Sequence, residues 1–136
     1  MTLALDTSGY ALFDAGFEPA TEQMERAGRL AMPTIALGEL LSGFRKGSRM
    51  RQNVARLEEF VEIFDVEWLE VTRGVADRYA DIHDELRRRG TPIPTNDLWI
   101  AACCLATDAA LLTSDPHFER VDGLRVMRLD YPPARR

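Results

Sequence analysis

Four acidic residues occupy positions from which they could share one site. Asp6 directly follows a short apolar run, and Asp115 follows another after Thr113 and Ser114. Asp97 and Glu39 each lie within a longer apolar stretch. Carboxylates gathered at one place raise one another's pKa and destabilise a fold unless a cation neutralises them. An all-oxygen set of ligands suits hard ions such as Mg²⁺ or Mn²⁺.

A divalent ion held by these acids predicts hydrolysis of a phosphodiester bond. The ion lowers the pKa of a bound water, orients it, and neutralises charge on the phosphate oxygens and the leaving group. Mg²⁺ usually takes one or two protein carboxylates and keeps several waters. We therefore expect Asp6 and Asp97 to hold one ion, with Glu39 and Asp115 completing its shell or forming a second site.

Each acid also has a purely structural interpretation. Asp6 and Asp115 are at ordinary starts of helices, and Glu39 could be a solvated residue at the edge of an apolar face. For Asp97 the two interpretations are evenly matched, because the helix dipole contributes about 0.3–1 kcal/mol but a buried carboxylate needs a partner. The functional interpretation depends on the four acids converging. His117 is expected to be a surface-loop histidine, with proton relay as the alternative.

The elements that must position these acids alternate along the chain. Apolar runs predict strands at residues 1–5, 30–32, 66–71, 110–113 and 124–129. Helical spacing predicts helices at residues 7–13, 21–28, 33–47, 49–64, 72–90 and 95–106, with Thr7 or Ser8 capping the first. This alternation predicts the α/β class, an open parallel sheet with helices on both faces. Ligands of such folds gather at the carboxyl ends of the strands.

Length and composition predict one globular domain. The chain has 136 residues, of which 46% are hydrophobic and 29% charged. We expect the domain to span residues 1–130, followed by a short tail at 131–136. No apolar run reaches the ~18–20 residues of a membrane span, and residues 1–6 lack the basic region of a signal peptide. We therefore expect a cytoplasmic protein without membrane contact.

The segments around the four acids resemble those of the PIN-domain ribonucleases, and most closely the VapC-type toxins of prokaryotic toxin–antitoxin modules. These segments are Leu5-Asp6-Thr7-Ser8, Gly38-Glu39-Leu40, Pro94-Thr95-Asn96-Asp97 and Leu112-Thr113-Ser114-Asp115. Their order and spacing span almost the whole chain. Gly9-Tyr10 departs from the pattern, which more often has aliphatic residues there.

The resemblance implies a three-layer α/β/α domain with a mainly parallel central sheet. It implies the toxin of a type II toxin–antitoxin system, a Mg²⁺- or Mn²⁺-dependent endoribonuclease. A homodimer inhibited by a cognate antitoxin is the assembly it implies. The catalytic and metal-binding acids of the family fall on Asp6, Glu39, Asp97 and Asp115. Supporting roles fall on Ser8, Thr113 and Asn96.

Charge gives a second indication of the substrate. The 22 acids and 17 bases give a net charge of -5, which argues against a protein drawn to nucleic acid by its overall field. All bases but Lys46 are arginine, the side chain suited to bidentate phosphate contact. We expect RNA backbone contact from a cluster where two helices meet. It comprises Arg45, Lys46, Arg49, Arg51 and Arg56.

Two other classes of function compete with a nuclease. The first is phosphoryl transfer through a covalent phosphate on Asp6. A haloacid-dehalogenase-like phosphatase would need a second acid where this chain has Ser8. A receiver domain would need a lysine after a late strand. The only lysine is Lys46. A non-catalytic RNA- or antitoxin-binding module on the same fold stays open, because it would share every element. Whether the four acids cleave RNA decides between the nuclease and the binding module.

Overall fold

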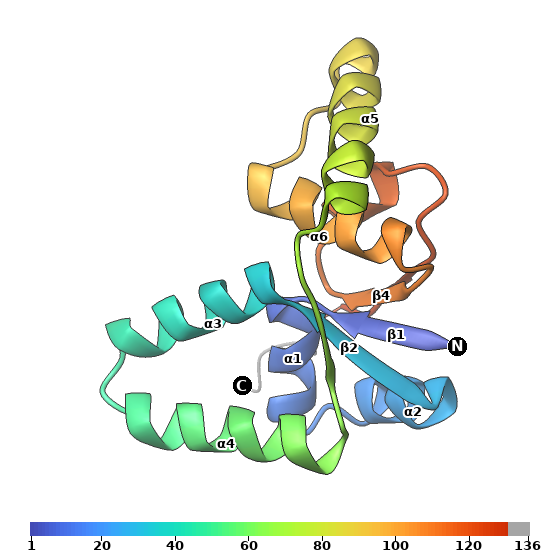
Figure 1. The fold of residues 1–136 in the computed structure, drawn as a ribbon. Coiled ribbons are helices and arrows are strands. Elements are labelled where there is room, and N and C mark those ends of the chain that lie inside the picture. The colour runs from blue at the N-terminus through green and yellow to red at the C-terminus, as the bar shows by residue number, and fades with distance from the viewer. Residues whose placement is uncertain (131–136) are drawn as a thin grey trace.

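Five short parallel strands form the centre of the computed structural model, which describes residues 1–130 (Figure 1). The strands are β1 (Thr2–Leu5), β2 (Arg29–Pro33), β3 (Glu67–Leu69), β4 (Ala110–Thr113) and β5 (Val126–Arg128). Their order across the sheet is β3-β2-β1-β4-β5, and every neighbouring pair is parallel. The expected tail at 131–136 lies outside the described residues.

Helices cover both faces of this sheet. They are α1 (Thr7–Asp14), α2 (Glu18–Ala27), α3 (Thr34–Lys46), α4 (Met50–Ile63), α5 (Arg73–Arg89) and α6 (Thr95–Ala106), with the short 3-10 helix η1 (Pro116–Arg120). Figure 1 shows α5 and α6 above the strands and α1 and α2 below them. The three-layer α/β/α prediction is confirmed. Within residues 1–130, every helix is too short or too polar to cross a lipid bilayer.

The predicted elements all exist, but several boundaries differ. The second helix begins at Glu18 instead of residue 21, because Pro19 fits the first turn of a helix, where its missing N–H is not needed. The strands expected at 66–71 and 124–129 shorten to three residues each at the two edges of the sheet. Asp6, and neither Thr7 nor Ser8, caps α1.

The core lies between the sheet and its two helical layers. Leu3 and Leu5 on the central strand β1 and Leu111 and Leu112 on its neighbour β4 are fully buried, as expected for a parallel sheet covered on both faces. The helix α6 buries six of its twelve residues, including both cysteines. Burial raises the pKa of the Cys103 thiol to about 11. Both cysteines are free and buried.

Candidate functional site

Asp6 lies at the carboxyl end of β1, where a buried carboxylate is held by three donors. Its Oδ1 accepts hydrogen bonds from the backbone N–H of Gly9 at 2.7 Å and the hydroxyl of Ser8 at 2.8 Å. Its Oδ2 accepts from the hydroxyl of Thr113 at 2.6 Å. Thr113 can reach Asp6 because β1 and β4 are neighbours with Leu5 opposite Leu112. The side chain of Asp6 is therefore fixed in position.

The buried charge of Asp6 is only partly compensated. Burial raises the pKa of this carboxyl above its ordinary value, and the three hydrogen bonds, which favour the ionised form, do not cancel that effect. The negative charge of Asp97 raises the pKa further. A carboxylate kept in this environment gains from a nearby cation.

Ser8 and Thr113 connect Asp6 to the turn after β4. Their hydroxyl oxygens lie 3.0 Å apart. The backbone N–H of Ser114 donates to the Ser8 hydroxyl at 2.9 Å, and that of Asp115 donates to the Thr113 hydroxyl at 3.0 Å. The two hydroxyls thus fix the backbone that presents Asp115, as well as the carboxylate of Asp6.

Gly9 has a steric reason for being glycine. A Cβ at this position would overlap the backbone carbonyl oxygen of Leu112 on β4. The first turn of α1 therefore packs directly against the β4 backbone, which brings the Gly9 N–H and the Ser8 hydroxyl onto Asp6. Glycine, and not the aliphatic residue that the family pattern more often has, therefore fits this position in the structure.

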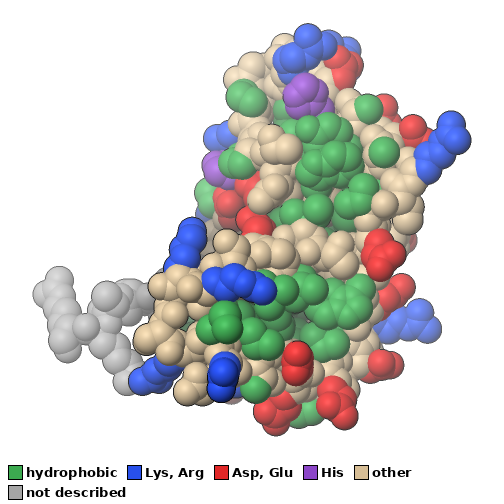
Figure 2. Space-filling view, turned by 60° about the vertical axis from the view of Figure 1, so that its left-hand side comes forward, with side chains coloured by type: hydrophobic (Ala, Val, Ile, Leu, Met, Phe, Trp, Pro, Cys, Tyr) green, Lys and Arg blue, Asp and Glu red, His purple; other side chains and the backbone are tan. Residues whose placement is uncertain are grey.

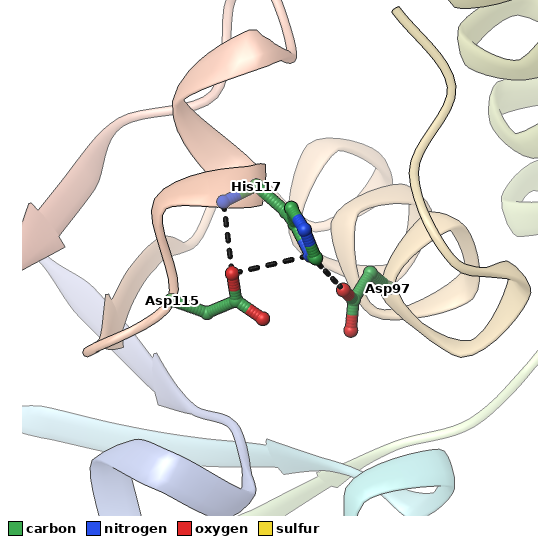
Figure 3. A group of neighbouring side chains, drawn as sticks. All are labelled: Asp97, Asp115 and His117. Atoms are coloured by element: carbon green, nitrogen blue, oxygen red, sulfur yellow. Dashed lines mark hydrogen bonds and ion pairs between the residues drawn. The ribbon is translucent and has the colours of Figure 1, made fainter.

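Asp97, Asp115 and His117 form a second group of side chains beside this network (Figure 3). Asp97 comes from the first turn of α6, Asp115 caps η1, and His117 lies in η1. The Nδ1 atom of His117 is 3.1 Å from Asp97 Oδ2 and 3.2 Å from Asp115 Oδ1. One ligand atom of each residue lies within 4.8 Å of the others, so the three could hold a metal ion.

The charges of the predicted acids act on Asp97. Burial of this half-buried group is the largest cause that raises its pKa, and the hydrogen bond with His117 opposes it. The negative charges of Asp115 and Glu39 raise the pKa again. Asp97 in turn raises the pKa of Asp6, so Asp97 is close enough to interact electrostatically with each of the other three acids.

Glu39 approaches from α3 and is held by two polar side chains. Its Oε1 accepts from the Thr7 hydroxyl at 3.2 Å, and its Oε2 accepts from the Asn96 amide at 3.4 Å. Asn96 is the residue before Asp97, so this contact places Glu39 next to the start of α6. Glu39, Asn96 and Lys46 line one open pocket.

The predicted acids are thus gathered at one edge of the sheet, with a difference in the pairing. Asp97 and Asp115 share the group with His117, and neither Asp6 nor Glu39 belongs to it. That Asp6 and Asp97 hold one ion together stays a prediction. The sequence predicts a surface-loop residue at His117, yet its ring contacts both carboxylates. The signal in the sequence is its place two residues after a helix-capping Asp.

The predicted basic cluster lies where α3 ends and α4 begins. It comprises Arg45, Lys46, Arg49, Arg51 and Arg56, all exposed. Arg56 pairs with Asp14 at 2.5 Å, whereas none of the other four forms an ion pair within residues 1–130. Arg45, Lys46, Arg49 and Arg51 are therefore available to bind an anion.

Comparisons with known proteins agree with this geometry. The sequence profile described as PIN domain matches residues 5–124. The tRNA(fMet)-specific endonuclease VapC of Shigella flexneri is 32% identical over 99 residues, which cover 72% of this chain and 74% of that protein. Ribonuclease VapC5 of Mycobacterium tuberculosis is 29% identical over 122 residues, 88% of this chain and 87% of the relative. The crystal structure of VapBC2 from Rickettsia felis bound to a promoter DNA fragment superposes with a TM-score of 0.85 at 25% identity, covering 96% of this chain and 100% of that one.

Proposed function

This chain belongs to the PIN domain family, within which its relatives are VapC ribonucleases, and from that membership we propose its function. It is the toxin of a type II toxin–antitoxin system and an endoribonuclease that hydrolyses RNA phosphodiester bonds with a divalent metal ion. The observation that carries the proposal is the gathering of Asp97 and Asp115 within ligand distance of a common point, with Asp6 and Glu39 electrostatically linked to them.

The donor set fits a divalent cation. Asp97 and Asp115 offer carboxylate oxygens, and the side chains are 15% and 31% exposed, so an ion there would be reached from solvent. The raised pKa of Asp97 reflects burial and negative neighbours, which a cation would offset. Asp97 and Asp115 would hold the ion, and Asp6 and Glu39 would supply the remaining negative charge. When bound, Mg²⁺ or Mn²⁺ neutralises charge on the scissile phosphate and lowers the pKa of a water molecule.

The other residues of the site act by positioning. Ser8, Gly9 and Thr113 hold the carboxylate of Asp6 with three hydrogen bonds, so that its negative charge has one fixed place. Thr113 also holds the backbone N–H of Asp115. Asn96 donates to Glu39 and keeps that carboxylate directed toward the start of α6. Fixed charges need no reorganisation during reaction, which is the main source of electrostatic catalysis.

The basic cluster supplies binding for the RNA backbone. Lys46 lines the same pocket as Glu39, so a strand whose phosphates contact Lys46 passes beside the acids. Arg49 and Arg51 extend the positive surface onto α4. Phosphate contacts of this kind do not depend on base sequence. The cluster therefore positions the RNA backbone, and other contacts select the cleavage site.

A cognate antitoxin is the proposed protein partner. Solved relatives from Rickettsia felis and Salmonella typhimurium are VapBC complexes. An apolar groove between α3 and α4 is the proposed contact surface, lined by Leu37, Leu41, Val54, Val61 and Trp68. Glu58 and Glu62 also line it, so an amphipathic segment with flanking Lys or Arg would fit. Figure 2 shows a hydrophobic area in the lower half of the molecule, with acidic side chains beneath it.

We also propose a homodimer, formed through the outer face of α5 and α6. Tyr79 and Trp99 are only partly buried there, and their rings stack with centroids 3.9 Å apart. A second copy would cover this aromatic pair. Sedimentation of the purified protein should give twice the mass of one chain, and Trp99→Arg should return it to the monomer.

Metal-dependent cleavage of RNA tests the proposed function. Purified protein is incubated with a tRNA pool in Mg²⁺, in Mn²⁺ and in EDTA. The proposal expects defined cleavage products with either metal and intact RNA with EDTA. The competing function, a binding module without activity, expects RNA binding with no cleavage under any of the three conditions.

A further inference from the structure

We propose that His117 is a direct ligand of the metal ion and makes the site prefer a first-row transition-metal ion over Mg²⁺. The inference rests on the proposed function, because it concerns the ion that the same site is proposed to hold. It differs from the set of four acids that the family resemblance implies, in which every ligand atom is an oxygen.

The position of the imidazole carries the inference. His117 Nδ1 faces two carboxylate oxygens at nearly equal distances, 3.1 Å to Asp97 Oδ2 and 3.2 Å to Asp115 Oδ1. Figure 3 shows the ring edge between the two carboxylates. An N–H at Nδ1 shared between two acceptors bonds to each less directly than to one, whereas a cation can contact all three atoms. With the proton of the neutral ring on Nε2, the lone pair of Nδ1 is free to bind the ion.

The backbone of η1 fixes the position of His117 relative to Asp115. The Asp115 carboxylate accepts a hydrogen bond from the His117 backbone N–H at 2.9 Å, which closes the first turn. Pro116 restricts the backbone between them, and Phe118 is fully buried on the other side. The side chain of His117 is nevertheless 37% exposed. The carboxylate of Asp115 thus holds the backbone of His117 and also contacts its ring. Ligands of a preformed metal site support one another in this way.

The chemistry of a mixed ligand set determines which ion it favours. Mg²⁺ binds oxygen ligands and dehydrates reluctantly, so an imidazole adds little to its affinity. First-row transition ions accept imidazole nitrogen, and their affinity for a given site rises from Mn²⁺ to Co²⁺. Two carboxylates and one imidazole therefore favour Mn²⁺ and Co²⁺ over Mg²⁺. A set made only of carboxylates would show a smaller difference.

The variant His117→Asn tests whether the ion requires the imidazole nitrogen or only a ligand atom at this position. The asparagine amide oxygen lies near the place of Nδ1 in histidine, so the variant offers oxygen where the wild type offers nitrogen. His83→Ala is the matched control, because it removes the only other histidine, which lies on α5 outside the group. Titration calorimetry gives the Mn²⁺ and Mg²⁺ affinities. Pulsed electron paramagnetic resonance of bound Mn²⁺ reports whether a nitrogen atom is directly coordinated.

The inference expects nitrogen coupling to Mn²⁺ in the wild type and in His83→Ala, and its loss in His117→Asn. It also expects His117→Asn to lower the Mn²⁺ affinity about tenfold or more and to change the Mg²⁺ affinity much less. The magnitude follows because removing even a group that only supports a ligand lowers metal affinity by about 10–100-fold. Mn²⁺ bound by the wild type without nitrogen coupling would overturn this inference and leave the proposed function standing. Equal losses for both ions in His117→Asn would also overturn it. A wild type that binds neither ion would overturn the metal site as a whole. If His117→Asn does not fold, isotopic labelling of histidine in the His83→Ala protein assigns the nitrogen signal to His117 directly.

Discussion

The hydroxyl of Thr113 donates to the carboxylate of Asp6 at 2.6 Å, although the two residues are 107 positions apart in the sequence. They meet because each directly follows or ends one of two adjacent parallel strands, β1 and β4. The same hydroxyl accepts from the backbone N–H of Asp115. One side chain thus ties together two of the acids proposed to act on RNA.

Replacing Thr113 by valine should therefore destabilise the fold and weaken catalysis together. Thr113→Val keeps the shape but leaves buried Asp6 without one donor and the Asp115 N–H without an acceptor. We expect a loss of about 1–3 kcal/mol in the free energy of unfolding, measured with urea, because a buried polar group is left unpaired. Thr107→Val is the control, since its hydroxyl caps α6 on an exposed residue. Equal stability of Thr113→Val and the wild type would contradict this role.

Gly9→Ala should damage the site through its backbone. The added Cβ would overlap the Leu112 carbonyl oxygen, so α1 must move away from β4 and take the Gly9 N–H and the Ser8 hydroxyl from Asp6. We expect a lower midpoint of thermal unfolding and loss of RNA cleavage. Gly43→Ala in α3 meets no atom within 4 Å and should instead stabilise the protein by up to about 1 kcal/mol. Similar effects of the two substitutions would show that the packing of α1 against β4 is unimportant.

Without metal, the protein should become less stable as pH rises above the ordinary pKa of an aspartate carboxyl. The pKa of Asp97 is raised in the folded state, first by burial and then by Asp115 and Glu39. The folded state therefore binds a proton more tightly than the unfolded state, and stability falls as pH rises from the ordinary pKa of 3.8 through the raised folded value. Asp97→Asn should flatten this decline in urea unfolding with EDTA present. Stability that rises through that window, with the Asn variant no different, would refute the assignment.

The basic cluster should contribute to RNA affinity in proportion to the phosphates it neutralises. Replacing Lys46 and Arg51 by Gln should weaken binding of a catalytically inactive variant to single-stranded RNA. The plot of log K against log salt concentration should become shallower, its slope changing by about 0.7 for each phosphate that the variant no longer neutralises. Arg26→Gln, an exposed change on α2, is the matched control. An unchanged salt slope in the double variant would place the RNA on another surface.

The sequence was sufficient to predict the fold class and the place of the acids, because both depend on local patterns. The apolar run before Asp6 and the run that precedes Thr113, Ser114 and Asp115 indicate strand ends. Parallel strands bring those ends to one edge of the sheet. The contacts within the site were not predictable in the same way. His117 pairs with Asp97 across 20 positions, and Ser8 with Thr113 across 105. These contacts depend on how α6 and η1 pack together, which residue spacing does not specify.

Cleavage of RNA by Asp97→Asn tests the central claim most directly. The substitution preserves the shape of the side chain, removes one negative charge from the group with Asp115, and leaves the fold intact, as circular dichroism should verify. Asp77→Asn, an exposed change on α5, controls for the loss of a carboxylate. We expect Asp77→Asn to cleave a tRNA pool at the wild-type rate in Mg²⁺ or Mn²⁺ and Asp97→Asn to leave it intact. Undiminished cleavage by folded Asp97→Asn would contradict the proposal that these acids are the catalytic site.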